Sequence, residues 1–253
     1  MDERTAMQLY TLRDVEGSLE SLLEWVAEAG FDGVEFAYRL PESEPGLIAE
    51  TLDRLNLSVA GVHANFGSLP GEQPSTVSRE RLRELCRTVA TTNVVVPYLE
   101  PSCFDDAESV METAAALSTL AESLADEGLR LHYHNHDQEF QRVDGDYAIE
   151  TLLARTDIEL ELDTGWAAYA GADPAALLER YDDRISLVHV KDVDAETGTA
   201  TQLGSGCLDL TRLGEQLRAS SVEWAIYEHD APETPLDAMA EGKRRLDEQV
   251  LDR

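Results

Sequence analysis

Lysine is nearly absent from this chain of 253 residues, and positive charge of any kind is scarce. Lysine occurs only at positions 191 and 243, and lysine and arginine together number 20 against 51 aspartates and glutamates. The formal net charge is therefore −31. Nucleic acids and anionic membranes recruit proteins through basic patches, and the basic cluster of this sequence is the short run Lys243–Arg245. The composition therefore predicts no nucleic-acid partner and no membrane partner.

The excess of acidic residues has its own consequence. So many like charges oppose the compact state at ordinary ionic strength, and concentrated salt screens them. Acid-rich, lysine-poor surfaces resemble those of proteins from salt-loving microbes, so we interpret the charge as a halophilic trait. The alternative is an acidic protein of an ordinary cytosol.

Cysteine is also rare, and Cys86, Cys103 and Cys207 lie far apart without the spacing of a metal site. An odd, scattered set predicts no disulfide framework and suits a reducing cytosol. No apolar run approaches the ~18–20 residues of a membrane helix. The start Met1–Arg4 is charged and no apolar stretch follows it, so we expect no signal peptide and a cytoplasmic location.

Short apolar runs rich in β-branched residues alternate with longer stretches of helical period. The predicted strands lie at 6–10, 33–37, 58–64, 93–99, 129–134, 158–163, 185–191 and 223–228, and the predicted helices at 18–29, 45–55, 75–91, 105–126, 147–154, 173–181, 209–219 and 235–251. Strands separated by helices pair in parallel. Eight such units in about 250 residues predict an α/β protein with a single (β/α)8 TIM barrel domain over 1–253. A doubly wound sheet is the alternative, but the first strand–helix turn lacks a glycine-rich phosphate loop.

Polar side chains gather at the predicted strand ends, where a parallel barrel carries its chemistry. They are Gln8, Glu35, His63, His134, Asn135, His136, Asp163, His189, Lys191 and Glu228. Singly, each has an ordinary explanation, such as an N-cap aspartate or a hydrogen-bonded core histidine. Together, carboxylates and imidazoles at one barrel mouth would repel each other or stay unsatisfied unless a cation lay among them. Mixed oxygen and nitrogen ligands predict one divalent ion, with Mn²⁺ favoured over Mg²⁺, Co²⁺ or Zn²⁺.

Six stretches in order carry a family resemblance. They are Gln8–Asp14, Gly30–Glu35, Tyr133–Phe140, Leu162–Trp166, His189–Asp192 and Tyr227–Asp230. Over essentially its whole length the chain resembles the sugar phosphate isomerase/epimerase superfamily, which has the xylose isomerase-like TIM barrel. The Tyr-His-Asn-His variant at 133–136 is similar to the branch that includes inosose-dehydratase-like proteins. The resemblance implies a small-molecule sugar substrate and a role in carbohydrate metabolism, and it leaves a homo-oligomer open.

The family pattern implies a metal held by four side chains from strands five to eight. Asp163, His189 and Glu228 match three of these positions. Many relatives carry glutamate at the fourth position, where this chain has His134. Either His134 binds the metal through its imidazole, which we favour, or Glu139 reaches back from the following loop.

The resemblance also implies catalytic roles. The metal polarises a carbonyl and its neighbouring hydroxyl, and a base takes the α-proton. Glu228 is expected to serve as one base, and the opposite face of the enediolate falls to His134, His136 or Glu139. Histidine in place of the strand-five glutamate shifts weight from two-base epimerisation toward β-elimination.

The remaining site residues are assigned to the substrate. Lys191 follows His189 by two residues and so lies on the same side of the strand, where it can hold a substrate hydroxyl or stabilise an enolate. The plainer alternative for Lys191 is a salt bridge. The residues expected to line the sugar pocket are Glu35, His63, His136 and Trp166.

The sequence therefore predicts a divalent-metal-dependent isomerase or epimerase of a ketose or aldose. One alternative is a metal-dependent lyase or dehydratase of a keto-sugar or keto-inositol. Another is a sugar-binding barrel without turnover, which three intact family ligands disfavour. A DNA-repair endonuclease of related fold would need a basic groove, and the net charge opposes one.

Overall fold

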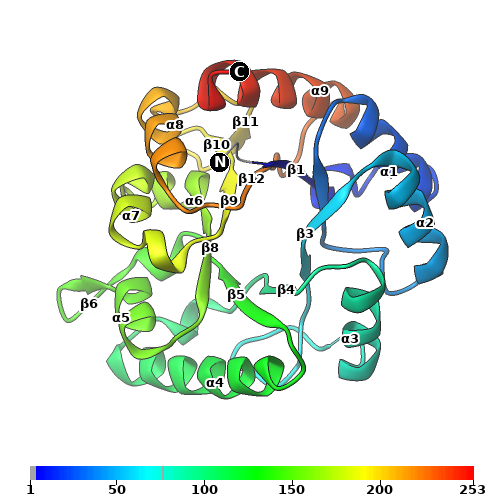
Figure 1. Ribbon diagram of the computed structural model, residues 1–253. Coiled ribbons are helices and arrows are strands. Elements are labelled where there is room, and N and C mark those ends of the chain that lie inside the picture. The colour runs from blue at the N-terminus through cyan, green and yellow to red at the C-terminus, as the bar shows by residue number, and fades with distance from the viewer. Residues whose placement is uncertain (1–3, 76) are drawn as a thin grey trace.

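The computed structural model describes residues 4–75 and 77–253, in which eight parallel strands close into a barrel (Figure 1). The barrel strands are β1 (Arg4–Gln8), β2 (Gly33–Phe36), β3 (Ser58–His63), β4 (Asn93–Val96), β5 (Arg130–His134), β8 (Glu159–Asp163), β9 (Leu187–Val190) and β12 (Trp224–Tyr227). Each strand pairs with its neighbours in chain order, and β12 closes the barrel against β1. The predicted (β/α)8 TIM barrel is confirmed.

Helices surround the barrel as an outer ring (Figure 1). They are α1 (Leu19–Glu28), α2 (Pro45–Leu55), α3 (Arg79–Thr88), α4 (Ala107–Ala125), α5 (Ala148–Arg155), α6 (Thr164–Tyr169), α7 (Pro174–Arg180), α8 (Leu210–Ala219) and α9 (Pro235–Arg245), which continues as the π-helical turn η5 (Leu246–Leu251). Local capping explains several helix starts, because the side chains of Ser18, Asp106 and Asp209 each accept a bond from the backbone N–H three residues later.

The smaller elements lie in connections that follow barrel strands, except η4, which lies between α7 and β9. They are two hairpins, β6 (Arg142–Val143) with β7 (Asp146–Tyr147) and β10 (Asp192–Val193) with β11 (Ala200–Thr201), and the short 3-10 helices η1 (Leu9–Leu12), η2 (Pro101–Cys103), η3 (Gln138–Phe140) and η4 (Asp182–Arg184). The loops after β5 and β9 thus gain structure of their own on the face where the strands end.

The predicted elements differ from the observed ones mainly at their ends. The strand predicted over 93–99 ends at Val96, and the helix predicted over 75–91 begins at Arg79 because Ser78 caps it. Thr76 and residues 1–3, on which the expectation for the chain start falls, lie outside the described residues. None of the helices in 4–75 and 77–253 is long and apolar enough to span a membrane.

The barrel interior is apolar at its centre and polar toward the carboxyl ends of the strands. The inner cluster consists of Ala6, Ala60, Val95, Leu187, Trp224 and Ile226. Strand β8 shows the change of polarity, since Glu159, Glu161 and Asp163 alternate with two leucines that belong to the outer core. A strand turns successive side chains to opposite faces, so the three acids of β8 point into the barrel.

Candidate metal centre

Four side chains meet where β5, β8, β9 and β12 end: His134, Asp163, His189 and Glu228. Their ligand atoms all lie within 4.8 Å of one another, and all four residues are buried. Within residues 4–75 and 77–253, Asp163 Oδ2 has no hydrogen-bond partner. His134 Nε2 and His189 Nδ1 lie 3.8 and 4.0 Å from that oxygen, too far for hydrogen bonds. A donor set of two imidazoles and two carboxylates fits a divalent cation, which these four side chains would hold together.

Lys191 lies beside this group and is almost fully buried. Its Nζ lies 2.7 Å from Asp230 Oδ2 and 3.4 Å from both Asp163 Oδ2 and Glu228 Oε2. Burial opposes the charge, but these carboxylates outweigh it and raise the pKa of Lys191 above its ordinary value. The predicted salt bridge is thus present, and the ammonium also lies 4.7 Å from the centre of the Trp166 ring.

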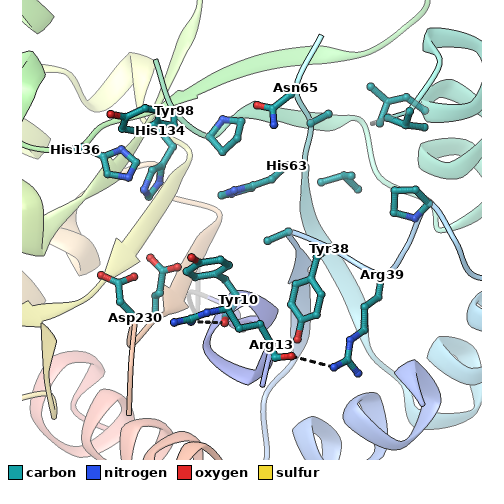
Figure 2. A pocket seen from close by; sticks show the side chains of 18 of the residues that line it. Tyr10, Arg13, Tyr38, Arg39, His63, Asn65, Tyr98, His134, His136 and Asp230 are labelled. Carbon is teal, nitrogen blue, oxygen red and sulfur yellow. Dashed lines mark hydrogen bonds between the residues drawn. The ribbon is translucent and has the colours of Figure 1, made fainter. Parts of the chain in front are cut away.

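A cavity of about 750 Å³ opens above the four side chains. Figure 2 shows its labelled polar and aromatic walls, which descend to His134. The aromatic residues that line it are Tyr10, Tyr38, Tyr98 and Trp166, and the predicted site residues that line it are His63, His134, His136, Trp166, Lys191 and Glu228. The cavity thus combines flat apolar faces with hydrogen-bonding groups, a combination suited to a sugar.

His136 presents a free imidazole nitrogen in this cavity. Its ring lies against Tyr98 and Trp166, with centroid separations of 5.0 and 5.6 Å. Nδ1 is buried and has no hydrogen-bond partner in the part of the chain that the structure describes. Burial, with a further contribution from His134, holds the pKa of His136 well below its usual value. The ring is therefore neutral.

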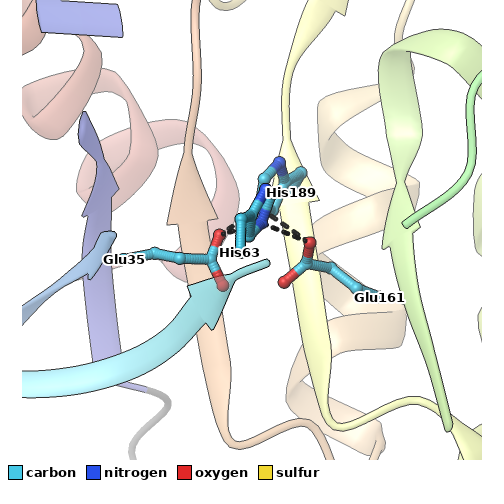
Figure 3. Close-up of side chains that lie close together, drawn as sticks. All are labelled: Glu35, His63, Glu161 and His189. Atoms are coloured by element: carbon cyan, nitrogen blue, oxygen red, sulfur yellow. Dashed lines mark hydrogen bonds and ion pairs between the residues drawn. The ribbon is translucent and has the colours of Figure 1, made fainter. Parts of the chain in front are cut away.

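A second, deeper group lies below the first and shares His189 with it (Figure 3). Glu35 Oε2 lies 2.6 Å from His189 Nε2 and 3.1 Å from His63 Nε2. Glu161 Oε2 approaches the same two nitrogens at 3.3 and 3.1 Å. Glu35, which we expected to line the pocket, is fully buried in this deeper layer, where Gln8 donates a bond to it at 2.7 Å.

The electrostatics of the metal-free site are those of crowded, buried acids. Burial, helped by the carboxylate of Glu228, raises the pKa of Asp163 to about 6. Burial lowers the pKa of His134 to about 4. Burial would lower the pKa of His189 too, but Glu161 and Glu228 outweigh it and raise that pKa well above the usual value. A proton on His189 and the ammonium of Lys191 place positive charge among these acids, and a divalent cation would take over the place of the His189 proton.

Glu139, the other ligand that the sequence left open, lies in η3 and outside the group of four. It is fully buried, accepts a bond from the hydroxyl of Tyr133, and accepts another from the backbone N–H of His136 at 2.8 Å. Burial raises its pKa to about 7. In this arrangement Glu139 supports the loop that carries His136.

Two residues that the sequence analysis left out belong to the site. Glu161 lies in the strand predicted over 158–163, where it alternates with Leu160 and Leu162 and so faces the same side as Asp163. Asp230 follows Glu228 by two residues and pairs with Lys191. The signal for both was the period of two, which places residues i and i+2 on one side of an extended chain.

The chain belongs to the family described as Xylose isomerase-like TIM barrel, which matches residues 23–249. It is 26% identical over 251 residues to an inosose dehydratase of Clostridium beijerinckii, covering 84% of this chain and 82% of that protein. Among solved structures, it is similar to a sugar phosphate isomerase/epimerase from Parabacteroides distasonis, with TM-score 0.77, 19% identity, and coverage of 99% and 95%.

The chain is also similar to a 3-keto-D-glucoside 4-epimerase from E. coli. The TM-score is 0.74 at 18% identity, and the match covers 96% of this chain and 98% of that one. At such identities the structural likeness establishes the fold. The family and the relatives together place the chain among enzymes of the isomerase, epimerase and dehydratase type.

Proposed function

We propose that the protein is a divalent-metal-dependent sugar isomerase or epimerase that works through an enediolate. The observation that supports this most is the group His134, Asp163, His189 and Glu228 at the floor of a sugar-sized cavity. One carboxylate oxygen of this group has no hydrogen-bond partner among the described residues. When bound there, a divalent ion supplies Lewis-acid polarisation of a substrate carbonyl and its neighbouring hydroxyl.

Glu228 is the group proposed to take the α-proton. It lies on the cavity wall, and Lys191 is 3.4 Å from its Oε2. The proton moves from the α-carbon to the carboxylate, and the electron pair of the broken C–H bond forms the double bond of the enediolate. In an isomerase or epimerase a proton then returns to carbon. His136, which lines the cavity, is the second proposed proton-transfer group.

The cavity also supports a sugar-like substrate. Tyr10, Tyr98 and Trp166 offer ring faces against which the C–H faces of a sugar can pack. Lys191 and Asp230 offer a donor and an acceptor for hydroxyl groups from the same wall. The structural neighbours named as sugar phosphate isomerase/epimerase and as 3-keto-D-glucoside 4-epimerase support this substrate class.

A lyase is the second candidate, because the curated relative from Clostridium beijerinckii is named inosose dehydratase. Elimination shares the first step, in which Glu228 removes the α-proton. The hydroxyl on the next carbon then leaves as water with a proton supplied by an acid. His136 lines the cavity, and its imidazole, once it has taken up a proton, would be that acid.

Solvent deuterium separates the two reactions. Protein loaded with Mn²⁺ is incubated in D₂O with ketohexoses, keto-inositols and 3-keto-sugars, and the product masses are read. An isomerase or epimerase gives a product that has gained deuterium and changed in no other way. A product lighter by one water assigns the lyase instead. A sugar that binds while no member of the panel exchanges deuterium would contradict both enzymes.

Glu228→Gln is the matching variant, and we expect deuterium exchange to fall by ~10²–10⁴-fold from loss of the base alone. The control is Glu223→Gln, which changes an acid just before β12 at the opposite end of that strand and should leave exchange unchanged. Equal effects of the two substitutions would remove Glu228 from the proposed chemistry.

A further inference from the structure

Glu161 is the acid below the metal group that contacts three imidazoles at once. It is fully buried in β8. Its Oε2 lies 3.0 Å from His134 Nδ1, 3.1 Å from His63 Nε2 and 3.3 Å from His189 Nε2. These side chains come from β3, β5 and β9, so one carboxylate connects three strands across the barrel. Figure 3 shows its contacts with His63 and His189.

The chemistry of the carboxylate decides which imidazole nitrogens carry protons. A carboxylate oxygen can only accept, so the nitrogens that face it are N–H groups. His134 is then protonated on Nδ1 and His189 on Nε2. By the same rule His189 Nδ1, which lies 3.0 Å from Glu228 Oε2, carries a proton that a bound ion would displace. The remaining nitrogens, His134 Nε2 and His189 Nδ1, are the two that approach Asp163 Oδ2 at 3.8 and 4.0 Å. The deeper group thus turns both histidines so that their remaining nitrogens point at the metal group.

We propose that Glu161 is a positioning residue of the metal centre. Its carboxylate fixes the tautomer and the ring orientation of His134, while Glu35, at 2.6 Å, is the closer partner of His189 Nε2. By accepting a hydrogen bond from the Nδ1–H group of His134, Glu161 also makes that imidazole a more basic ligand. This partly replaces the negative charge that a carboxylate ligand would bring. This inference rests on the proposed function only in requiring the metal, because it concerns binding of the ion and no step of turnover.

Glu35 provides the internal comparison. It approaches the same layer from β2 and contacts His63 and His189. Of the two acids, Glu161 is the one with a hydrogen bond to His134 in the described part of the chain. Removing the Glu161 carboxylate therefore disturbs mainly His134, while removing that of Glu35 disturbs mainly His189.

An alternative interpretation of the deeper group is a second metal site. The ligand atoms of Glu35, His63, Glu161 and His189 also lie within 4.8 Å of one another. Two ions would then bind the two nitrogens of His189, which would have to lose both its protons. A neutral imidazole keeps one N–H, so the geometry points to one ion above and an N–H to carboxylate contact below.

The test measures Mn²⁺ affinity by calorimetry on metal-stripped protein, without substrate. Glu161→Gln should weaken binding by ~10–100-fold, the usual effect of losing an outer partner of a ligating histidine. In a His134→Glu background the same Glu161→Gln change should cause no loss, because no imidazole remains at position 134 to be held and two neighbouring carboxylates no longer repel each other. A general weakening of the barrel would appear equally in both backgrounds.

Glu35→Gln is the matched control, and its effect on affinity should be equal in the two backgrounds. Metal analysis of the wild type should give one ion per chain. The inference is overturned if Glu161→Gln leaves affinity unchanged, if it lowers affinity equally in both backgrounds, or if the wild type holds two ions and Glu161→Gln loses one. If the enzyme turns over a sugar but the effect of Glu161→Gln on metal affinity does not depend on the residue at position 134, the inference alone is overturned. If that dependence is found but no sugar is turned over, the proposed function alone is overturned.

A second readout needs no variant and covers the case in which Glu161→Gln does not fold. Nitrogen NMR of the histidine rings in Zn²⁺-loaded wild type should show His134 protonated on Nδ1 and His189 protonated on Nε2. The opposite tautomer on His134 would overturn the proposal, since Glu161 would then have no N–H to accept.

Discussion

The two ends of the barrel interior differ in how fully their charged side chains are compensated. At the amino end, Arg130 donates to Asn93 at 2.8 and 3.1 Å and pairs with Glu159 and Glu223 at 3.3 and 3.2 Å. Each acid there has a guanidinium within reach, and water reaches the group because the Arg130 side chain is 40% exposed. The charged side chains at this end therefore compensate one another.

At the carboxyl end, the acids Glu35, Glu161, Asp163 and Glu228 are buried, and the ammonium of Lys191 touches two of them. Burying acids without full compensation lowers stability. Strand β8 spans both ends, so it carries the compensated acid Glu159 at one end and the ligand-group acid Asp163 at the other. We infer that the charged residues of the amino end contribute to stability, and that those of the carboxyl end are arranged to bind a cation.

The largest expected effect is loss of metal binding when an acid at the carboxyl end is replaced. Asp163→Asn should weaken Mn²⁺ binding by at least about 100-fold, because it removes a ligand charge. The side-chain oxygen that accepts the Trp166 N–H at 2.8 Å is retained, so α6 keeps its N-cap. Thermal stability of the metal-free protein should stay equal or rise, because a buried acid is removed. Metal analysis and thermal unfolding measure the two effects.

The control lies on the same strand at the amino end. Glu159→Gln should leave metal content unchanged and lower stability by about 1 kcal/mol, since it weakens the contacts with Arg130 and Ser186. If both substitutions removed the metal, or both lowered stability alike, the two ends would not differ as the comparison claims.

The second effect concerns the exposed acids, which salt screens more strongly than buried ones. With 51 acids against 20 bases, raising KCl from dilute to molar concentration should raise the melting temperature by roughly 10 °C, about 3 kcal/mol for a chain of this length. The wild type and Asp163→Asn should respond equally, because the altered acid is buried. A melting temperature that is flat or falls with KCl would refute the halophilic interpretation.

The smallest effect comes from His132, which lies on β5 between the two ends. It is fully buried, and neither ring nitrogen has a hydrogen-bond partner in residues 4–75 and 77–253. Burial lowers its pKa to about 4 from the ordinary 6.5. Below pH 6.5 the unfolded chain therefore binds a proton that the folded protein refuses, and the free energy of unfolding falls as pH falls. Between pH 6.5 and 5 the loss is about 2 kcal/mol.

Denaturant unfolding at the two pH values checks this, with His132→Leu as the comparison. The variant lacks the titrating ring, so its stability should depend less on pH than that of the wild type by about the same 2 kcal/mol. Identical pH dependence in the two proteins would show that His132 is not buried as a neutral ring.

Much of the fold was predictable, because alternation of strand and helix is a local pattern. The eight strand–helix units and the closed barrel were predicted and are confirmed. Helix α6 was missed because its six residues are too few for a periodic signal, and its start depends on the Asp163 side chain as N-cap. The substrate, the ligand set and the metal stay predictions.

Strand alternation alone predicts which side chains share a face at the barrel mouth. A strand turns alternate residues to one side, so Glu161 and Asp163 face the same way, as do His189 and Lys191. The contacts of Glu161 with His134 and of Glu35 with His189 follow only from the three-dimensional structure. The reason is physical: contacts of about 3 Å between strands depend on barrel closure and register, and these are set by packing across the whole molecule and not by neighbours in the chain.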